Sequence, residues 1–391
     1  MIPFQKAYEI VMSSAFKTGT EVVPLGSSLN RILAEDVRSD MDMPPFNKST
    51  VDGFACRRKD LDHDLEIIET IPAGKWPEKT VEASLCSRIM TGAAVPDGAD
   101  CVVMVEDTQL LSTGKLRFTG TLTKDNIAFR GEDIRKGDIV IKAGRQIRPQ
   151  DIAVFASVGY VDVRAGIRPS IAVISSGSEL VEPSEQPGIP QIRNSNASQL
   201  LAQILEAGAD GKYYGIARDD EDETLSVVEK AIAENDIVIL TGGVSMGDFD
   251  FVPSVLERAG VKILFTRVAV QPGKPTTFGV HPEAIVFGLP GNPVSSFIQF
   301  GLLLRPLISK MMGGEWHPVT CSLPAGEKYT RKSADRMMII PAKITGEKQV
   351  VVVEYHGSAH ISALPAADGI IFLEVGKKVI EKGEIVEVRY F

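Results

Sequence analysis

Between Pro169 and Met312 the sequence alternates short apolar runs with longer stretches whose apolar residues recur at helical spacing. Runs such as 171–174 and 236–240 are too short for helices and have the composition of buried strands. Strands and helices that alternate in this way form an open α/β sheet with helices on both faces, a doubly wound domain. The pattern predicts strands at 171–174, 212–216, 236–240, 261–270, 276–280 and 284–287, and helices at 197–207, 224–233, 252–259 and 294–312.

Outside this region the pattern of the sequence changes. Residues 4–15 and 28–35 have helical spacing, as do residues 148–158. Residues 44–140 have the pattern of short strands and turns, so we expect a β-rich region there. After residue 313 the strand pattern returns, with a turn at Lys382-Gly383 that is typical of small barrels. The expected C-terminal strands are at 349–354, 369–374 and 384–390.

Composition narrows the class of protein. The 42 basic and 51 acidic residues leave a net charge of −9 on 391 residues, which argues against nucleic acid and anionic membrane as partners. The longest apolar run, 297–304, is far short of the roughly 20 residues that span a bilayer. The N-terminus has no signal-peptide pattern, and the four cysteines show no CxxC spacing. We therefore expect a cytoplasmic protein with free, mostly buried thiols.

Five loops follow the predicted strands of the α/β region. In an open α/β sheet, ligands bind at the carboxyl ends of the strands, so these loops can converge on one crevice. Each loop taken singly is equally well explained as an ordinary turn, and only their coincidence favours a site. They are the loops at 175–179, 218–220, 241–250, 271–275 and 289–293.

Two of these loops are rich in glycine and lead into helices. Gly242 and Gly243, and the loop that contains Asn292, can expose backbone N–H groups that bind an anion such as phosphate. Lys274 and Arg267 can add positive charge. The chain contains neither a G-x-x-x-x-G-K-[ST] nor a G-x-G-x-x-G motif, so a standard nucleoside triphosphatase or dinucleotide reader is not indicated.

Three carboxylates lie on the same loops. Glu179, Asp219 and Asp250 would repel a bound phosphate, and a divalent cation resolves this conflict because hard oxygen ligands suit Mg²⁺. Asp219 and Asp220 precede a predicted helix and can equally be caps of that helix. The residues predict a phosphorylated ligand held together with Mg²⁺.

In the β-rich region, residues 47–55 place polar groups beside Gly53, and Thr91 and Asp133 lie in glycine-containing segments. Taken alone, these segments are best explained as turns. In order along the chain, however, the motifs resemble the molybdopterin molybdenumtransferase family over essentially the whole sequence. The resemblance rests on segments 45–55, 89–93, 96–100, 130–133, 176–180, 241–245, 272–275 and 288–295. The C-terminal domain of gephyrin is similar.

The resemblance implies four domains and a homodimer whose site is shared between the chains. The implied domains are a discontinuous elongated domain (1–43 and 141–169), an inserted β-rich domain (44–140), an α/β molybdopterin-binding domain (170–313) and a C-terminal β-barrel (314–391). It implies insertion of molybdate into adenylyl-molybdopterin with Mg²⁺-dependent release of AMP. The adenylyltransferase of the same pathway is a further candidate partner.

The resemblance also implies roles for individual residues. Catalytic positions are matched by Asp52, Thr91 and Asp133, and metal positions by Glu179, Asp219 and Asp250. Positions that bind substrate or oxyanion are matched by Gly242, Gly243, Ser245, Arg267, Lys274, Pro290, Asn292, Ser295, Arg336 and Ser358. Gln271 and Arg267 depart from lysines found in some members, which bears on the choice between molybdate and tungstate.

Two other function classes fit parts of the sequence. A scaffold could reuse this fold, as the gephyrin domain does, but a scaffold needs no cluster of carboxylates. The adenylyltransferase that makes the substrate would resemble only the α/β region, whereas the first 169 residues and the C-terminal strands argue against it.

Overall fold

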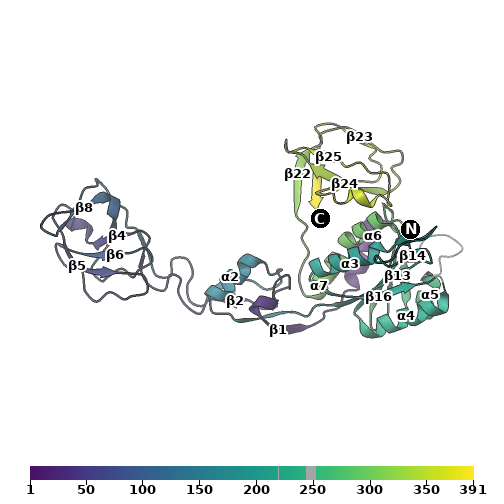
Figure 1. Cartoon of the computed structure of the whole chain (residues 1–391), viewed down its shortest axis with the longest axis horizontal. Helices are drawn as coiled ribbons and strands as arrows, with labels where there is room; N and C mark the ends of the chain where they lie inside the picture. Colours follow the sequence, from purple (N-terminus) through teal and green to yellow (C-terminus); the bar gives the residue numbers. More distant parts are fainter. Residues whose placement is uncertain (219, 244–251) are drawn as a thin grey trace. The chain divides into compact units, whose positions relative to one another are not determined.

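The computed structural model describes residues 1–218, 220–243 and 252–391, which form two compact units (Figure 1). The first unit comprises residues 1–35, 143–149 and 162–391, and the second comprises residues 36–142 and 150–161. Each is described by itself. In the described residues, no helix combines the length and the hydropathy that a membrane crossing requires.

The first unit contains a six-stranded sheet in the order β16-β13-β17-β21-β20-β18. The first four strands are parallel, whereas β20 is antiparallel to β21 and β18 is antiparallel to β20. This confirms the predicted α/β class. The bounds are Ser170–Ser176 for β13, Asp210–Ala217 for β16, Ile237–Thr241 for β17, Lys262–Phe265 for β18, Thr277–Val280 for β20 and Ile285–Leu289 for β21.

Helices cover both faces of this sheet because side chains alternate along its strands. Ile171 and Val173 of β13 pack in one core with residues of α1, α3, α6 and α7. Ala172 and Ile174 pack in the other core with residues of α4 and α5 (Figure 1). The helices are α1 (Phe4–Ser13), α3 (Ser195–Glu206), α4 (Glu221–Glu234), α5 (Val252–Arg258), α6 (Pro293–Gln299) and α7 (Arg305–Met311).

Two predictions of helices need correction. Residues 28–35 are not a helix: Ile32 and Leu33 form bridges to Gln146 and Ala165, so their backbone groups pair with segments far along the chain. The single helix expected at 294–312 is divided by a π-helical turn, Phe300–Leu304, between α6 and α7. Strand β1 (Thr20–Pro24) pairs with β12 (Asp162–Gly166), and a short 3-10 turn, Leu25–Ser27, follows β1.

The C-terminal part of the first unit is a second sheet, in the order β19-β24-β26-β28-β22, with β25 beside β24. Strand β19 belongs to the α/β part of the sequence, so the segment before Pro272 is paired directly with the C-terminal strands. The bounds are Val270–Gln271 for β19, Thr320–Pro324 for β22, Met337–Ile344 for β24, Val350–Val352 for β25, Gly369–Leu373 for β26 and Ile385–Tyr390 for β28. The short β23 (Tyr329–Thr330) pairs with β27 (Val379–Ile380), and Ile361–Ala363 is a 3-10 turn.

The second unit is β-rich, as predicted, with a four-stranded sheet in the order β5-β6-β4-β7. Cys56 on β4 lies opposite Cys86 on β6 and Cys101 on β7, and all three thiols are buried and free, as expected. The bounds are Gly53–Cys56 for β4, Glu66–Ile71 for β5, Leu85–Ile89 for β6 and Cys101–Met104 for β7.

Shorter elements extend this unit. The predicted hairpin is present as β8 (Thr108–Leu110) and β9 (Leu116–Phe118). Strand β2 (Val37–Arg38) pairs with β11 (Ile139–Ile141), and β3 (Lys48–Ser49) pairs with β10 (Ile127–Ala128). The predicted helix is α2 (Pro149–Ser157), and Arg58–Asp60 and Val105–Asp107 are 3-10 turns.

Candidate functional site

A hollow of about 740 Å³ lies where the parallel strands β13, β17 and β21 end. Three of the predicted loops meet there as expected, and Pro275 of a fourth lines the same hollow. Five of the predicted site residues line it: Glu179, Gly242, Gly243, Pro290 and Asn292. Their convergence is the geometry that a ligand at the carboxyl edge of an α/β sheet requires.

Gly242 is a position where only glycine fits. Its φ is +97°, and a Cβ atom there would lie 2.1 Å from the carbonyl oxygen of Ser176. Its N–H donates to the carbonyl oxygen of Leu289 at 3.1 Å. The loops after β13, β17 and β21 therefore approach one another closely enough to form a single wall.

Asn196, in the first turn of α3, also lines this hollow, and sequence reasoning missed it. Its Nδ2 donates to Thr241 Oγ1 at 2.9 Å and to the carbonyl oxygen of Gly291 at 2.7 Å. One buried amide therefore ties the loop after β17 to the loop after β21. Among the described atoms, Asn196 Oδ1 and Ser176 Oγ have no hydrogen-bond partner although both are buried.

Asn194 begins α3 and connects the helix to the adjacent strands. Its Oδ1 accepts from the N–H of Ala197, and its Nδ2 donates to Ser175 Oγ at 3.0 Å and Tyr213 OH at 2.9 Å. Tyr213 donates in turn to Glu182 Oε1 at 2.8 Å. Burial, together with this carboxylate, raises the pKa of Tyr213 to about 12, so the phenol remains a neutral donor. This network fixes the side of the hollow that α3 forms.

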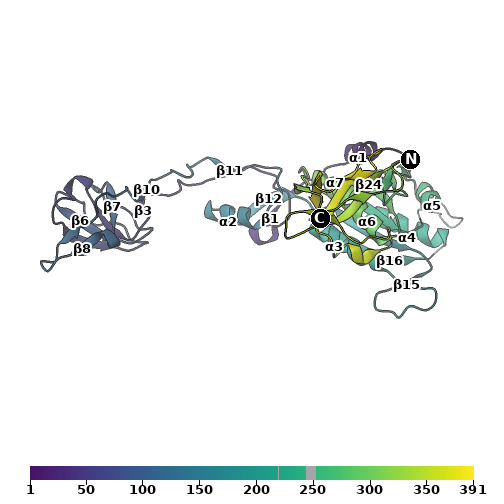
Figure 2. The same ribbon diagram turned by 90° about the horizontal axis from the view of Figure 1, so that it is seen from above.

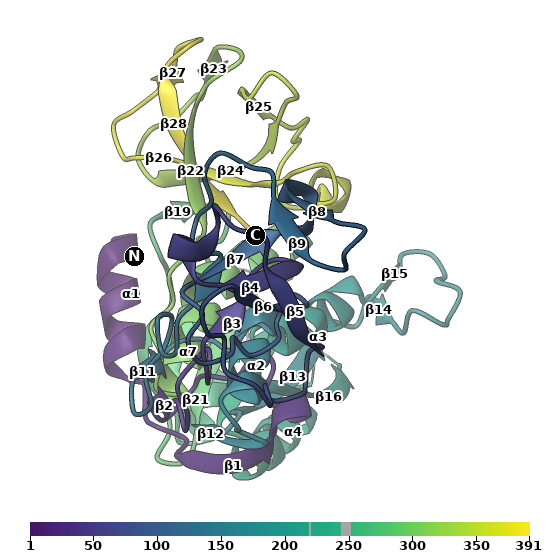
Figure 3. The same cartoon turned by 90° about the vertical axis from the view of Figure 1, so that its left-hand side faces the viewer.

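The network also holds the start of a long loop between β14 (Leu180–Val181) and β15 (Ile192–Arg193). The loop projects from the first unit in two perpendicular views (Figure 2 and Figure 3). Arg193 at its end lines the hollow. Its guanidinium is held by the loop itself, because Nε donates to the carbonyl oxygen of Glu185 at 3.1 Å.

Glu179 is an exposed carboxylate at the rim of the hollow. A Cβ atom on Gly177 would lie 2.4 Å from Glu179 Oε2, so the carboxylate folds back over the turn that follows β13. Asp219, Asp250 and Ser245 lie outside the described residues. Within the described ranges, no cluster of three or more acidic, histidine or cysteine side chains has the geometry of a metal site.

The loop that contains Ser358 joins the hollow from the C-terminal sheet. Asn292 Nδ2 donates to Ser358 Oγ at 2.8 Å, and the N–H of Val294 donates to the carbonyl oxygen of Ser358 at 3.1 Å. Ala359 and Ile361 beside it line the hollow. Ser295, in the first turn of α6, is buried and is not among the described lining residues.

The predicted cations are not among the described residues that line the hollow. Lys274 is exposed next to Pro275, and the carbonyl oxygen of Lys274 accepts from the N–H groups of Val268 and Thr276. Arg336 Nη1 donates to the carbonyl oxygen of Val270 at 3.1 Å. Arg267 is half-buried in the same segment. Arg267 and Lys274 therefore flank β19 along the chain, and Arg336, directly before β24, is bonded to the Val270 carbonyl of that strand.

In the second unit, Asp52 and Thr91 form a close pair. The N–H of Thr91 donates to Asp52 Oδ1 at 2.7 Å, and its hydroxyl donates to the same oxygen at 3.0 Å. These bonds, with a smaller contribution from the charge of Arg88, hold the pKa of Asp52 below its usual range. Asp52 is therefore an exposed, ionised carboxylate at neutral pH.

Asp133 lies in a segment attached to the same region of the second unit. The N–H of Asp133 donates to the carbonyl oxygen of Met43 at 3.1 Å, and the N–H of Arg130 donates to Asn47 Oδ1 at 2.9 Å. Arg130 Nε also donates to Asp42 Oδ2 at 2.7 Å. The exposed Asp133 carboxylate is thus carried by a segment that is bound to residues 43–47, just before β3.

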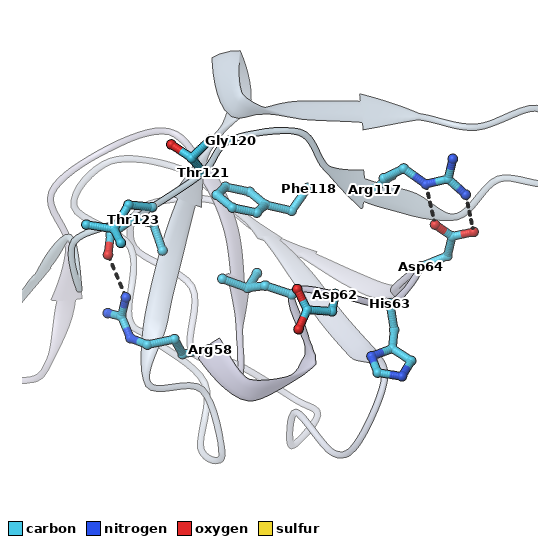
Figure 4. A pocket seen from close by; sticks show the side chains of 11 residues that line it. Arg58, Asp62, His63, Asp64, Arg117, Phe118, Gly120, Thr121 and Thr123 are labelled. Carbon is cyan, nitrogen blue, oxygen red and sulfur yellow. Dashed lines mark hydrogen bonds and ion pairs between the residues drawn. The ribbon is translucent and has the colours of Figure 1, made fainter.

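Figure 4 shows a second hollow, of about 380 Å³, in the second unit. It includes Arg58, which follows β4, whereas Asp52 precedes β4, so the two lie at opposite ends of that strand. Its two arginines are already paired: Arg117 forms two hydrogen bonds to Asp64, and Arg58 donates to the carbonyl oxygen of Thr123 and pairs with Asp125. None of the predicted site residues lines it. We therefore place the candidate site at the first hollow and at Asp52, not here.

Three family models together match most of the chain. The MoeA N-terminal region (domain I and II) matches residues 2–159, a probable molybdopterin binding domain matches residues 172–310, and the MoeA C-terminal region (domain IV) matches residues 323–391.

Curated relatives match over nearly the full length. The chain is 35% identical over 402 residues to the molybdopterin molybdenumtransferase of Staphylococcus epidermidis, which covers 99% of this chain and 95% of that protein. It is also 35% identical over 403 residues to the molybdopterin molybdenumtransferase of Bacillus subtilis, covering 99% of this chain and 93% of that protein.

Solved structures agree. A molybdopterin biosynthesis MoeA protein from Pyrococcus horikoshii is 32% identical, covers 100% of this chain and 99% of its own, and superposes with a TM-score of 0.79. A second structure of that name from the same organism is 28% identical, covers 100% of both chains and has a TM-score of 0.85.

Proposed function

The chain belongs to the molybdopterin molybdenumtransferase family and is a transferase of molybdenum cofactor synthesis, and from this premise we propose that it inserts molybdate into adenylyl-molybdopterin with Mg²⁺-dependent release of AMP. One observation carries the proposal. The hollow at the carboxyl edge of the α/β sheet brings amide-rich turns and the Glu179 carboxylate together, as a phosphorylated ligand with a cation requires.

The turns of the hollow bind the pterin and its phosphate. Gly243 offers a backbone N–H group, Gly242 holds this turn against the end of β21 through its own N–H, and Asn292, held by Ser358, offers a polar side chain beside Pro290. Ser245 is proposed to add a hydroxyl. Asn196 supports this role because it fixes the spacing between two of these turns.

Glu179 is proposed to bind Mg²⁺ together with Asp219 and Asp250. The fit is chemical: Glu179 is an exposed hard-oxygen donor at the rim of the hollow and the one carboxylate among the described residues that line it. When bound, Mg²⁺ neutralises charge on the phosphoanhydride. The residues of this chain position the phosphates and supply the carboxylates.

Asp52 is proposed to act as a catalytic carboxylate with Thr91 and Asp133. Support comes from the two hydrogen bonds of Thr91, which lower the pKa of Asp52 and so stabilise its charged form. Ser295 and the three cations Arg267, Lys274 and Arg336 are proposed to hold the substrate or the molybdate oxyanion. Gln271 carries no charge where some relatives have lysine, so these cations supply the positive charge of that region.

We also propose the domain organisation implied by the sequence, with four domains at 1–43 plus 141–169, 44–140, 170–313 and 314–391, the last a β-barrel. The active assembly is proposed to be a homodimer that combines the α/β domain of one chain with Asp52 of the other. The adenylyltransferase of the pathway is proposed as a partner that delivers substrate.

Reconstitution tests the proposal. The purified chain is incubated with adenylylated molybdopterin, Mg²⁺ and molybdate, and two products are followed: AMP by chromatography, and active cofactor by its ability to activate an apo-molybdoenzyme. Both should appear together and only with all three additions. Active cofactor without AMP release, or AMP release without cofactor, would contradict the proposed reaction.

A further inference from the structure

Trp76 is unusual because a residue with so large an apolar ring is 71% exposed. Phe46 contacts it edge to face, with ring centroids 5.6 Å apart at 86°. We propose that the Trp76–Phe46 pair is a stacking platform for the adenine ring of the adenylylated substrate. This inference rests on the proposed function and deepens it, since it assigns a place for the adenylyl group in the second unit.

The tryptophan is held on an anchored loop. Residues 72–75 form a turn in which the N–H of Lys75 donates to the carbonyl oxygen of Pro72 at 3.2 Å. After the ring, the carboxylate of Glu69 accepts from the N–H groups of Glu78 at 3.2 Å and Lys79 at 3.1 Å. A fixed, exposed ring can bind a flat ligand without the entropy cost of ordering a loop.

The platform shares one edge of the sheet with the Asp52–Thr91 pair. Strands β5 and β6 are parallel, and the N–H of Met90 donates to the carbonyl oxygen of Ile71 at 3.1 Å, so both strands end at this edge. Trp76 follows β5 and Thr91 follows β6. Asp52 precedes β4, which is antiparallel to β6, and therefore lies at the same edge.

Phe46 reaches this edge from a different segment. It lies two residues before β3, and Ser49 of β3 is hydrogen-bonded to the loop after β6. The N–H of Ser49 donates to the carbonyl oxygen of Ala93, and the carbonyl oxygen of Ser49 accepts from the N–H of Gly92 at 2.8 Å. The ring pair therefore joins two loops that flank the carboxylate.

Cations at the same edge fit the phosphate of a nucleotide. Arg88, on β6, is exposed and is close enough to Asp52 for its charge to act on that carboxylate. The Arg130 side chain is 67% exposed while its Nε is bound to Asp42, so its outer nitrogens face solvent. Exposed aromatic rings and arginines in the segments at one end of a sheet are groups that bind bases and phosphates.

The substrate carries two fused heteroaromatic ring systems, and adenine is the better assignment. The molybdopterin-binding family model covers residues 172–310, all in the first unit, which accounts for the pterin. We therefore assign the ring pair of the second unit to the adenylyl group. Stacking of the pterin on Trp76 is the alternative, and the test separates the two.

Tryptophan fluorescence of the full chain gives a direct test because the sequence has two tryptophans, Trp76 and Trp316. In a Trp316→Phe variant, AMP should quench the remaining emission saturably, whereas ribose 5-phosphate, which lacks the base, should not. By calorimetry, Trp76→Ala should bind AMP about tenfold more weakly, within the range of a base–aromatic stack. Trp76→Phe retains a ring and should bind within about threefold of the native chain.

In turnover, Trp76→Ala should raise the KM for adenylylated molybdopterin and leave kcat largely intact. Equal affinity of Trp76→Ala and the native chain for AMP would overturn the inference, as would quenching by molybdopterin but not by AMP. If AMP binds through Trp76 but the native chain never releases AMP from the adenylylated pterin, the nucleotide site is supported and the proposed function fails.

Discussion

Thr91 donates two hydrogen bonds to a single oxygen of Asp52, one from its N–H at 2.7 Å and one from its hydroxyl at 3.0 Å. The two residues come from different strands of the β-rich sheet, since Asp52 precedes β4 and Thr91 follows β6. Both bonds favour the charged carboxylate, so the pKa of Asp52 is lowered and the group stays ionised as the pH falls.

Thr91→Val should therefore move the acid limb of the pH–rate profile to higher pH. The variant keeps the N–H bond and loses the hydroxyl bond, which raises the pKa of Asp52 towards its ordinary value. At neutral pH Asp52 remains ionised in both proteins, so the readout is the position of the limb and not the rate. Thr91→Ser restores the hydroxyl and should restore the limb. Superimposable acid limbs for Thr91→Val and the native chain would contradict this account of Asp52.

Glu179→Gln should weaken the dependence on magnesium, because the amide keeps the shape of the side chain and removes its charge. We expect the Mg²⁺ concentration for half-maximal AMP release to rise about tenfold or more. Glu182→Gln is the matched control: Glu182 is a nearby carboxylate that accepts from Tyr213 and is not among the described lining residues. Identical magnesium titrations for Glu179→Gln and Glu182→Gln would argue against Glu179 as a ligand.

Gly242→Ala should destabilise the chain strongly, since the new Cβ would meet the carbonyl oxygen of Ser176 at 2.1 Å in addition to the strain at φ +97°. Gly215→Ala controls for the strain, because Gly215 has φ +92° and its Cβ would meet no described atom within 4 Å. We expect a cost of about 1–2 kcal/mol at Gly215, and a larger one at Gly242. Urea midpoints measured by circular dichroism compare the two. Equal urea midpoints for Gly242→Ala and Gly215→Ala would contradict the prediction, because the loops after β13 and β17 would then move apart at no cost to stability.

Asn196→Asp should impair substrate binding. It replaces the donor that bridges Thr241 and Gly291 with a carboxylate that repels the Gly291 carbonyl oxygen, so the two loops separate. Loss of a buried bridge costs about 1–3 kcal/mol, which predicts a KM for adenylylated molybdopterin raised about tenfold or more.

Gln199→Glu is the control for Asn196→Asp, because it makes the same chemical change on the same helix. The side-chain amide of Gln199 donates to the carbonyl oxygen of Pro293, and Gln199 is not among the described residues that line the hollow. This variant should lose a similar hydrogen bond without changing the KM for adenylylated molybdopterin. If both variants alter KM equally, Asn196 acts on stability alone and not on the geometry of the hollow.

The α/β region could be predicted well because its central strands β13, β17 and β21 are buried on both faces. β13 and β17 each contain four consecutive apolar residues, 171–174 and 237–240, which is the pattern of a buried parallel strand. The ordered loop motifs likewise predicted the family, which the matches along the chain confirm. Asp52 and Thr91 were matched from motifs 39 positions apart, and the structure brings them into contact.

Other features depend on contacts that spacing cannot reveal. The segment 28–35 has helical spacing, yet Leu33 pairs with Ala165 and donates its N–H to Arg145, more than a hundred residues away. Asn196 was missed because an asparagine at a helix start is usually a cap, and here Asn194 is the cap. A second asparagine two residues after Asn194 was the available signal.

The most direct test of the central claim is the amount of AMP released from adenylylated molybdopterin by the native chain and by Asp52→Asn, with Mg²⁺ and molybdate present. Because Asp52 is exposed, the substitution should leave folding and assembly intact, which circular dichroism and sedimentation verify. We predict release by the native chain and loss of release by the variant. Equal release by both proteins, or none by the native chain, would contradict the account.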